Sequence, residues 1–209
     1  GRLADVTGGT TDGGSTGGDS GGDTGGGEPD PGGGDEPTPK VTIPVIGDLP
    51  IVSSAGFVHP GIFVDIKGLE FVKNKLKNGE EPWKSAFNTA KNARGLYKSG
   101  SKLGSLSYTP TPFTEVSCAN DKSTYPNIRF GCGEMQDDAD AAYVQALAWY
   151  YTGDERYAKN AIKIMDAWSS TLKEMNNGAG NSGGNIRLRA AWVAEVFPRA
   201  AEIIRYTYP

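Results

Sequence analysis

The segment from Cys132 to Leu172 constrains the fold most, because its apolar residues recur at helical spacing on both sides of one Thr-Gly-Asp turn. Before the turn, the apolar positions are Ala139, Ala142, Tyr143, Ala146, Leu147 and Tyr150. After the turn, they are Tyr157, Ala161, Ile164, Met165, Trp168 and Leu172. Gly153 suits a left-handed position at the end of the first helix, and Asp154 is able to cap the second. The segment therefore predicts an αα-hairpin.

A second helical pair is predicted upstream. Asp65 is able to cap a helix that ends at Gly79 and carries one apolar stripe, formed by Leu69, Val72 and Leu76. Pro82 fits the first turn of the next helix. The buried stripe of this helix would be Trp83, Ala86, Phe87, Ala90 and Ala93. These residues predict another αα-hairpin.

The remaining segments are one long loop and one apolar helix. Residues 94–133 are dominated by glycine, proline, serine and threonine, which predicts an irregular segment. Residues 186–206 are apolar around most of a helix circumference, which favours a helix buried between neighbours. Pro198 either kinks that helix or restarts it after Phe197. No run of 18 or more apolar residues occurs, so we expect no membrane partner.

Composition separates the start of the chain from the rest. Residues 1–40 hold 15 of the 30 glycines and eight acids against two bases, a net charge of −6. Such a stretch buries too little apolar surface to fold, so residues 1–45 are predicted to be a disordered linker. Residues 46–209 form the predicted domain. Beyond residue 40 there are 17 acids and 19 bases, a charge of +2 that is too small to indicate nucleic acid.

Cys118 and Cys132 flank a polar, turn-rich stretch. A disulfide between them would stabilise the fold by about 3 kcal/mol in the chain-entropy description. With the linker composition, this predicts an oxidising compartment, so the protein would be secreted or periplasmic. The alternative is two unpaired thiols in a cytosolic protein. Two cysteines and one histidine are too few for a closed zinc site, and we expect neither metal nor cofactor.

Several motifs, in order along residues 56–208, together resemble the amino-terminal half of the alginate lyase family. The motifs are FVHPGI from Phe57, PWK from Pro82, YTP from Tyr108, the segment Cys132–Leu172, and RAAEIIR from Arg199. The resemblance implies an all-α fold, an incomplete (α/α) toroid of stacked αα-hairpins. It also implies a polysaccharide lyase that cleaves alginate or a related glucuronan by β-elimination.

β-Elimination needs a neutralised C5 carboxylate, a base for the C5 proton and an acid for the departing O4. In the family an Asn, a His, an Arg and a Tyr share these duties, and their motifs are expected beyond Pro209. The resemblance therefore predicts a truncated toroid and an inactive fragment. The chain begins at Gly1 with neither an initiator Met nor a signal h-region, so its start is expected to be a mature end or a cut. A further module before the linker would fit this organisation.

Five residues are candidates for substrate binding. Arg187 and Arg189 would meet uronate carboxylates with forked donors, or would be solvated arginines at a helix end. Trp192 would stack on a sugar ring, or would belong to the core. Tyr108 and Asn120, in the long loop, would line a cleft. His59, the only histidine, is a weak candidate base, and a structural role in a turn is favoured.

Two other interpretations remain open for this chain. Asp137 and Asp138 are expected to serve a helix N-terminus rather than substrate, and Tyr143 to lie in the core. Separately, the chain would be a noncatalytic carbohydrate-binding domain that kept the toroid and lost the acid and base, or a helical-repeat interaction module. The second alternative rests on the length of the hairpin, which is about that of a 34-residue repeat, although no second copy occurs at that period. The sequence leaves open which uronan is the substrate, and whether the action is endo or exo.

Overall fold

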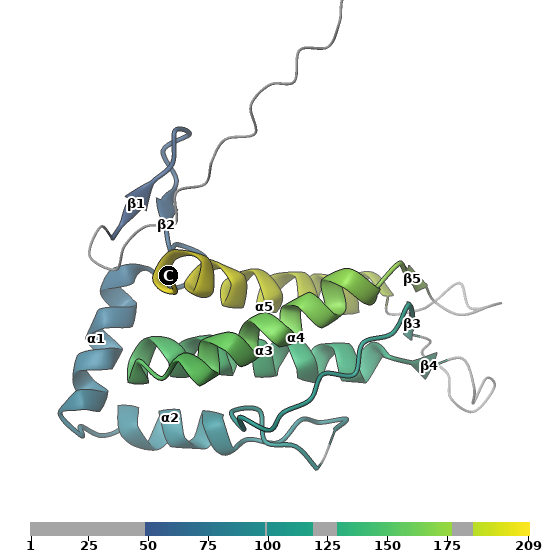
Figure 1. The fold of residues 1–209 in the computed structure, drawn as a ribbon, viewed down its shortest axis with the longest axis horizontal. Helices are drawn as coiled ribbons and strands as arrows, with labels where there is room; N and C mark the ends of the chain where they lie inside the picture. Colours follow the sequence, from purple (N-terminus) through teal and green to yellow (C-terminus); the bar gives the residue numbers. More distant parts are fainter. Residues whose placement is uncertain (1–48, 99, 119–128, 177–185) are drawn as a thin grey trace, which may run out of the picture. The chain divides into compact units, whose positions relative to one another are not determined.

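A computed structural model describes residues 49–98, 100–118, 129–176 and 186–209 (Figure 1). The predicted linker at residues 1–45 and the candidate residue Asn120 lie outside the described residues. Everything described belongs to one compact unit, which spans residues 41–209.

The upstream helical pair is present. Helix α1 spans Ile66–Lys77 and helix α2 spans Trp83–Asn92. The Asp65 carboxylate accepts a hydrogen bond from the Gly68 backbone N–H at 2.8 Å, which satisfies one free donor of the first turn. Pro82 immediately precedes the first helical residue rather than lying inside the first turn.

The central hairpin is also confirmed. Helix α3 spans Cys132–Thr152 and helix α4 spans Glu155–Thr171. Gly153 has a φ of +71°, the left-handed conformation that glycine adopts without steric cost. The Asp154 carboxylate then accepts from the Arg156 backbone N–H at 3.0 Å. The turn residues thus end one helix and begin the next.

Helix α5 spans Ile186–Thr207 and is continuous through Pro198. Helix α3 packs against both α4 and α5, and α2 runs along another side of it (Figure 1). Among the described residues, no helix is long and apolar enough to cross a bilayer.

Within the described ranges, five short strands accompany the helices, and the all-α prediction did not include them. Strands β1 (Ile51–Val52) and β2 (Val58–His59) form an antiparallel pair. Strand β3 (Glu115–Cys118) pairs antiparallel with β4 (Arg129–Phe130) and parallel with β5 (Glu174–Asn176). Buried backbone N–H and C=O groups need hydrogen-bond partners. Strand β5 supplies such partners to β3, which belongs to the long loop between α2 and α3.

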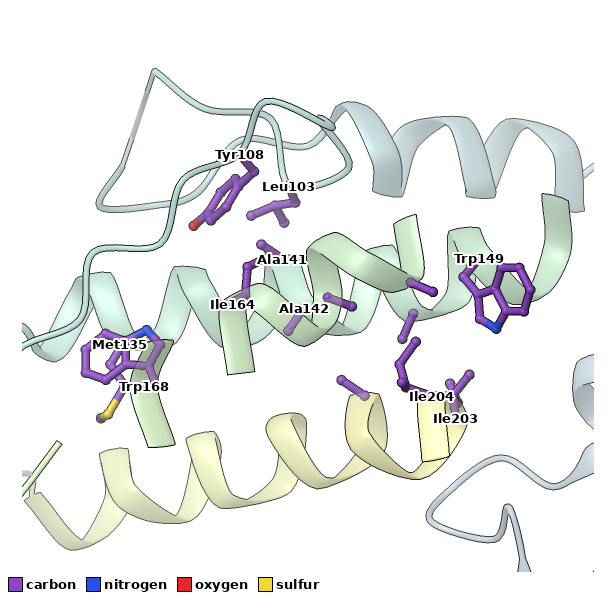
Figure 2. Packing of buried hydrophobic residues seen from close by; sticks show 14 of the residues in the cluster. Leu103, Tyr108, Met135, Ala141, Ala142, Trp149, Ile164, Trp168, Ile203 and Ile204 are labelled. Atoms are coloured by element: carbon purple, nitrogen blue, oxygen red, sulfur yellow. The ribbon is translucent and has the colours of Figure 1, made fainter. Parts of the chain in front are cut away.

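The core lies where α3, α4 and α5 meet. Figure 2 shows Ala142 of α3, Ile164 of α4 and Ile203 of α5 in one cluster of buried residues. Six alanines on α3 and α4 are completely buried, namely Ala141, Ala142, Ala146, Ala148, Ala158 and Ala161. Small side chains at these positions allow the helices to approach closely, and the larger residues fill the remaining space.

Candidate functional site

A disulfide fixes the beginning of α3. Cys118, at the end of β3, is bonded to Cys132, the first residue of α3, with 5.3 Å between their Cα atoms. This confirms the predicted bond. Gly131 precedes it with a φ of +72°, and a Cβ atom there would lie 2.9 Å from the Phe113 ring. The strand and the helix are therefore joined covalently at a turn that only glycine fits well.

Asp137 holds the loop that follows α2. Its carboxylate accepts backbone hydrogen bonds from Leu96, Tyr97 and Lys98, at 2.9, 2.8 and 2.6 Å. The sequence interpretation placed Asp137 at a helix N-terminus. Because α3 begins five residues earlier, at Cys132, the residue lies in the second turn and faces the loop instead. Its role in this structure is to anchor the loop.

Asp138 is completely buried, and its carboxylate accepts hydrogen bonds from four donors. It accepts hydrogen bonds from the Tyr108 hydroxyl, the Trp168 indole N–H and the Lys98 ammonium group, each at 2.7 Å. The Thr111 backbone N–H donates the fourth, also at 2.7 Å. A buried carboxylate with this many partners organises the core around it.

Tyr108 therefore lies in the core rather than along a binding surface. Its side chain is 1% exposed. Burial, followed by the neighbouring Asp138 carboxylate, raises the pKa of Tyr108 far above its ordinary value. The loop position suggested a wall of a cleft, but an aromatic ring beside a buried carboxylate favours the interior.

A polar surface also lies between α3 and α5. It is formed by sides of the two helices other than those that meet the core and the loop. We call it the α3/α5 face and define it by Gln136, Asp140 and Tyr143 of α3 with Arg189, Trp192 and Arg199 of α5. The α3 residues are spaced four and three apart, so they share one side of the helix.

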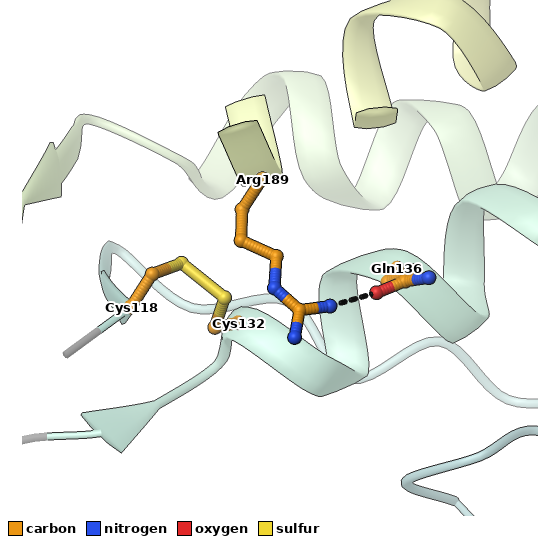
Figure 3. The surroundings of a disulfide bond; sticks show 4 residues. All are labelled: Cys118, Cys132, Gln136 and Arg189. Carbon is orange, nitrogen blue, oxygen red and sulfur yellow. Dashed lines mark hydrogen bonds between the residues drawn. A yellow bond between two sulfur atoms is a disulfide. The ribbon is translucent and has the colours of Figure 1, made fainter. Parts of the chain in front are cut away.

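Arg189 links the two helices at one end of this face. Its guanidinium group donates a hydrogen bond to the Gln136 side-chain oxygen, close to the disulfide (Figure 3). The same group lies 4.8 Å from the Trp192 ring centroid and 5.8 Å from that of Tyr97. The Trp192 side chain is 39% exposed. Arg189 and Trp192 are thus brought together, whereas Arg187 is simply exposed.

Arg199 is placed further along the face. Its guanidinium group lies 3.7 Å from the Phe63 ring centroid and 5.8 Å from that of Tyr143, and it pairs with Glu195. Phe63 is 76% exposed and has a φ of +64°, which is strained for a residue with a side chain. Within the described residues, the buried Nε of Arg199 has no hydrogen-bond partner. A strained aromatic residue and an incompletely bonded arginine are typical of a functional site.

Two titratable groups of α3 accompany these arginines. Burial, and then the charge of Asp137, raise the pKa of Asp140 above its ordinary value. Burial also raises the pKa of Tyr143, while the charge and hydrogen bond of Arg199 oppose this. Tyr143 is therefore neutral near pH 7 and able to donate a proton beside an arginine.

His59 lies outside the α3/α5 face. Its Nδ1 atom is 2.6 Å from a carboxylate oxygen of Glu202, and its ring stacks on Tyr206 at 4.6 Å. The same Glu202 oxygen accepts from the Gly61 backbone N–H at 3.1 Å. The imidazole thus joins strand β2 to α5, in agreement with a structural role.

The sequence interpretation missed Gln136, Asp140 and Arg199 as members of this face. Arg199 stands in one of the recognised motifs, but only the contact with Phe63 and Tyr143 reveals its position. Among the described residues, no cluster of three His, Cys, Asp or Glu side chains would hold a metal ion.

Comparison with known proteins identifies one family. The sequence model described as alginate lyase matches residues 84–205, which include all of α3 and α4 and most of α2 and α5. No curated protein and no solved structure matches the chain. All six residues of the α3/α5 face lie inside the matched region.

Proposed function

We propose that this chain, which belongs to the alginate lyase family, acts on an acidic uronate polymer, alginate or a related glucuronan, and cleaves it by β-elimination. The observation that carries the proposal is the pair of arginines, Arg189 and Arg199, on a helix of the family-matched region. Both guanidinium groups lie beside aromatic rings, an arrangement suited to a sugar that bears a carboxylate.

The reaction determines what such a site must supply. A base removes the C5 proton, the electron pair forms the C4–C5 double bond, and the C4–O4 bond breaks. The departing O4 then takes a proton. The C5 carboxylate carries the developing negative charge, so cationic donors fixed beside it lower the barrier.

The α3/α5 face suits the carboxylate part of this chemistry. Arginine presents a planar fork of donors that matches a carboxylate in two parallel hydrogen bonds. Trp192, partly exposed and beside Arg189, offers a ring on which a pyranose stacks. We assign substrate binding to Arg189, Arg199 and Trp192.

Tyr143 is our candidate for proton transfer to O4. It is neutral near pH 7, and its ring centroid lies 5.8 Å from the Arg199 guanidinium carbon, so a carboxylate held by Arg199 would lie close to its hydroxyl. The alternative, a domain that binds carbohydrate without cleaving it, needs only the arginines and Trp192. A variant that removes the Tyr143 hydroxyl separates the two.

The toroid and the compartment are part of the same proposal. The α1–α2 and α3–α4 hairpins, with α5 packed on α3, support an (α/α) toroid over residues 46–209, with residues 1–45 as the linker. The disulfide supports a secreted or periplasmic location, because such bonds persist in oxidising compartments.

The test measures unsaturated uronate by its ultraviolet absorbance, with alginate and glucuronan as substrates. It uses this chain and any longer natural protein that contains it. We expect Arg199→Gln to lower kcat/KM by about a hundredfold, because a fixed donor to the developing charge is lost. Tyr143→Phe should lower kcat by about a hundredfold and change KM little.

Arg205→Gln is the matched control, since this exposed arginine of α5 lies beyond the face, with its guanidinium carbon 5.7 Å from the Tyr206 ring centroid. Its activity should equal that of the wild type. Product formed equally well by Tyr143→Phe would exclude the assigned proton donor. Binding of oligouronate with no product from any protein containing the chain would instead favour the noncatalytic domain. Product formed by the 209-residue chain alone would refute the prediction of an inactive fragment.

A further inference from the structure

A hollow of about 370 Å³ lies between α1, α2 and the C-terminal end of α3. Its lining includes Lys73 and Lys77 of α1, Lys84, Phe87 and Asn88 of α2, and Tyr151 of α3. None of these residues belongs to the α3/α5 face. The hollow combines three ammonium groups with two aromatic rings.

The charges in this hollow are largely uncompensated. No Asp or Glu lines it. Other lysines nearby in the sequence are paired, since Lys75 lies 2.6 Å from Glu80 and Lys98 lies 2.7 Å from Asp138. Within the part of the chain that the structure describes, Lys77 and Lys84 form no hydrogen bond or ion pair. Two free ammonium groups at one concave site are available to an anion.

Two neighbouring acids do not pair with Lys77 or Lys84. Glu70 forms an ion pair with Lys73 at 3.6 Å and also accepts a hydrogen bond from the Tyr150 hydroxyl, so it partly compensates the Lys73 charge alone. Hydrogen bonds from Ser85 lower the pKa of Glu81, and Lys84 contributes less to that shift. The Glu81 carboxylate therefore already has its main partner outside the hollow.

The aromatic lining makes the site more specific than a basic patch. Phe87 and Tyr151 meet edge to face, with ring centroids 5.5 Å apart and an interplanar angle of 84°. Burial raises the pKa of Tyr151 to about 12, so its hydroxyl stays neutral. Asn88 adds an amide that both donates and accepts. Pyranose rings present C–H faces to aromatic side chains and hydroxyl groups to amides, and a uronate adds the carboxylate.

We infer that this hollow is a second binding site for an acidic oligosaccharide, separate from the α3/α5 face. Lys77 and Lys84 hold a uronate carboxylate, and the Phe87–Tyr151 pair supports the sugar ring. The identity of the polymer rests on the proposed function. Such a site keeps a long polymer attached and raises its effective concentration at the α3/α5 face.

The test titrates the whole chain with a saturated oligouronate at low salt and follows the backbone amides of Asn88 and Thr152 by NMR. The variant Lys77→Gln/Lys84→Gln should bind at these amides about tenfold more weakly, because two charge-assisted contacts are removed. Lys163→Gln/Lys173→Gln, two exposed lysines outside the hollow, removes the same charge and should leave binding unchanged.

Three outcomes would overturn the inference. Equal binding by both double variants would show that only net charge matters. An equal response to a neutral oligosaccharide would exclude carboxylate recognition, and tighter binding of a peptide of residues 1–40 would assign the hollow to the chain's own acidic segment. The readout is binding rather than product, so Arg199→Gln, which tests the proposed function, should leave these amide shifts intact.

Discussion

Helix α3 carries three aspartates within four residues, and they serve two different environments. Asp137 and Asp138 face the loop after α2 and accept seven hydrogen bonds between them. Asp140 lies on the α3/α5 face, where burial and the charge of Asp137 raise its pKa. The first two carboxylates are held in place by many donors, whereas the environment of the third disfavours its charged form.

The difference shows that position on the helix, rather than residue type, decides the role of each acid. Successive residues of a helix point about 100° apart, so neighbours in the sequence meet different elements. On the side that meets the loop, donors from the chain itself form hydrogen bonds with both carboxylates. The side with Arg189 and Arg199 retains an arginine nitrogen that lacks a partner among the described residues. One side holds the fold together, and the other carries the residues that we propose bind the substrate.

Removing Asp138 should have the largest effect on stability. Asp138→Ala removes the carboxylate that accepts from the Lys98 ammonium group and from two buried donors, the Tyr108 hydroxyl and the Trp168 indole N–H, so the free energy of unfolding should fall by about 3–5 kcal/mol. Urea unfolding followed by tryptophan fluorescence measures this. Asp166→Ala, an exposed aspartate of α4, should change it by less than about 0.5 kcal/mol. Equal effects of the two substitutions would remove the distinction between the sides of α3.

Removing the disulfide should have the next largest effect. Cys118→Ser/Cys132→Ser should lower the free energy of unfolding by about 3 kcal/mol, since the unfolded chain regains the freedom of the closed loop. Thermal unfolding by circular dichroism at matched pH measures the loss. The affinity for oligouronate should stay within about threefold of the wild type if the bond acts on stability alone. A larger loss would mean that the nearby Arg189–Gln136 contact depends on the disulfide (Figure 3).

The smallest change in the free energy of unfolding is expected for a substitution of Asp140, and this change is an increase rather than a decrease. The folded pKa is raised, so the stability that neutral Asp140 contributes is complete below its ordinary pKa of 3.8. This contribution is lost as the pH rises through the folded value. Asp140→Asn stays uncharged and should therefore be more stable than the wild type at pH 7. Urea midpoints measured from pH 3 to pH 7 should show the difference growing with pH, and a constant difference would contradict the raised pKa.

Local patterns predicted the helices well. The spacing of alanines and aromatic residues, with Gly153 and Asp154 between them, gave both helices of the central hairpin and its turn. Those signals depend on residues a few positions apart, which physical propensities describe directly. The strands were missed, because β3 pairs with β5 across more than 50 residues and neither has a strong alternating pattern.

The site was predicted only in part for the same reason. Arg189 and Trp192 are three positions apart on one helix, so their proximity follows from periodicity. The meeting of Arg199 with Phe63, and of Gln136 with Arg189, depends on how distant segments pack. Tyr108 was predicted to line a cleft, because no local sequence signal indicates that its hydroxyl donates a hydrogen bond to Asp138 on α3.

The contact between His59 and Glu202 joins residues 143 positions apart. Closing so long a segment costs much chain entropy, and the contact stabilises the chain little until both ends are already structured. The α3–α4 hairpin, by contrast, is connected by a turn of a few residues and is able to form early. We therefore expect the chain to assemble from its centre outward, with the seam between β2 and α5 closing last. That seam would then also be the first to open under mild denaturation, which hydrogen exchange at Gly61 would reveal as protection lost ahead of α3.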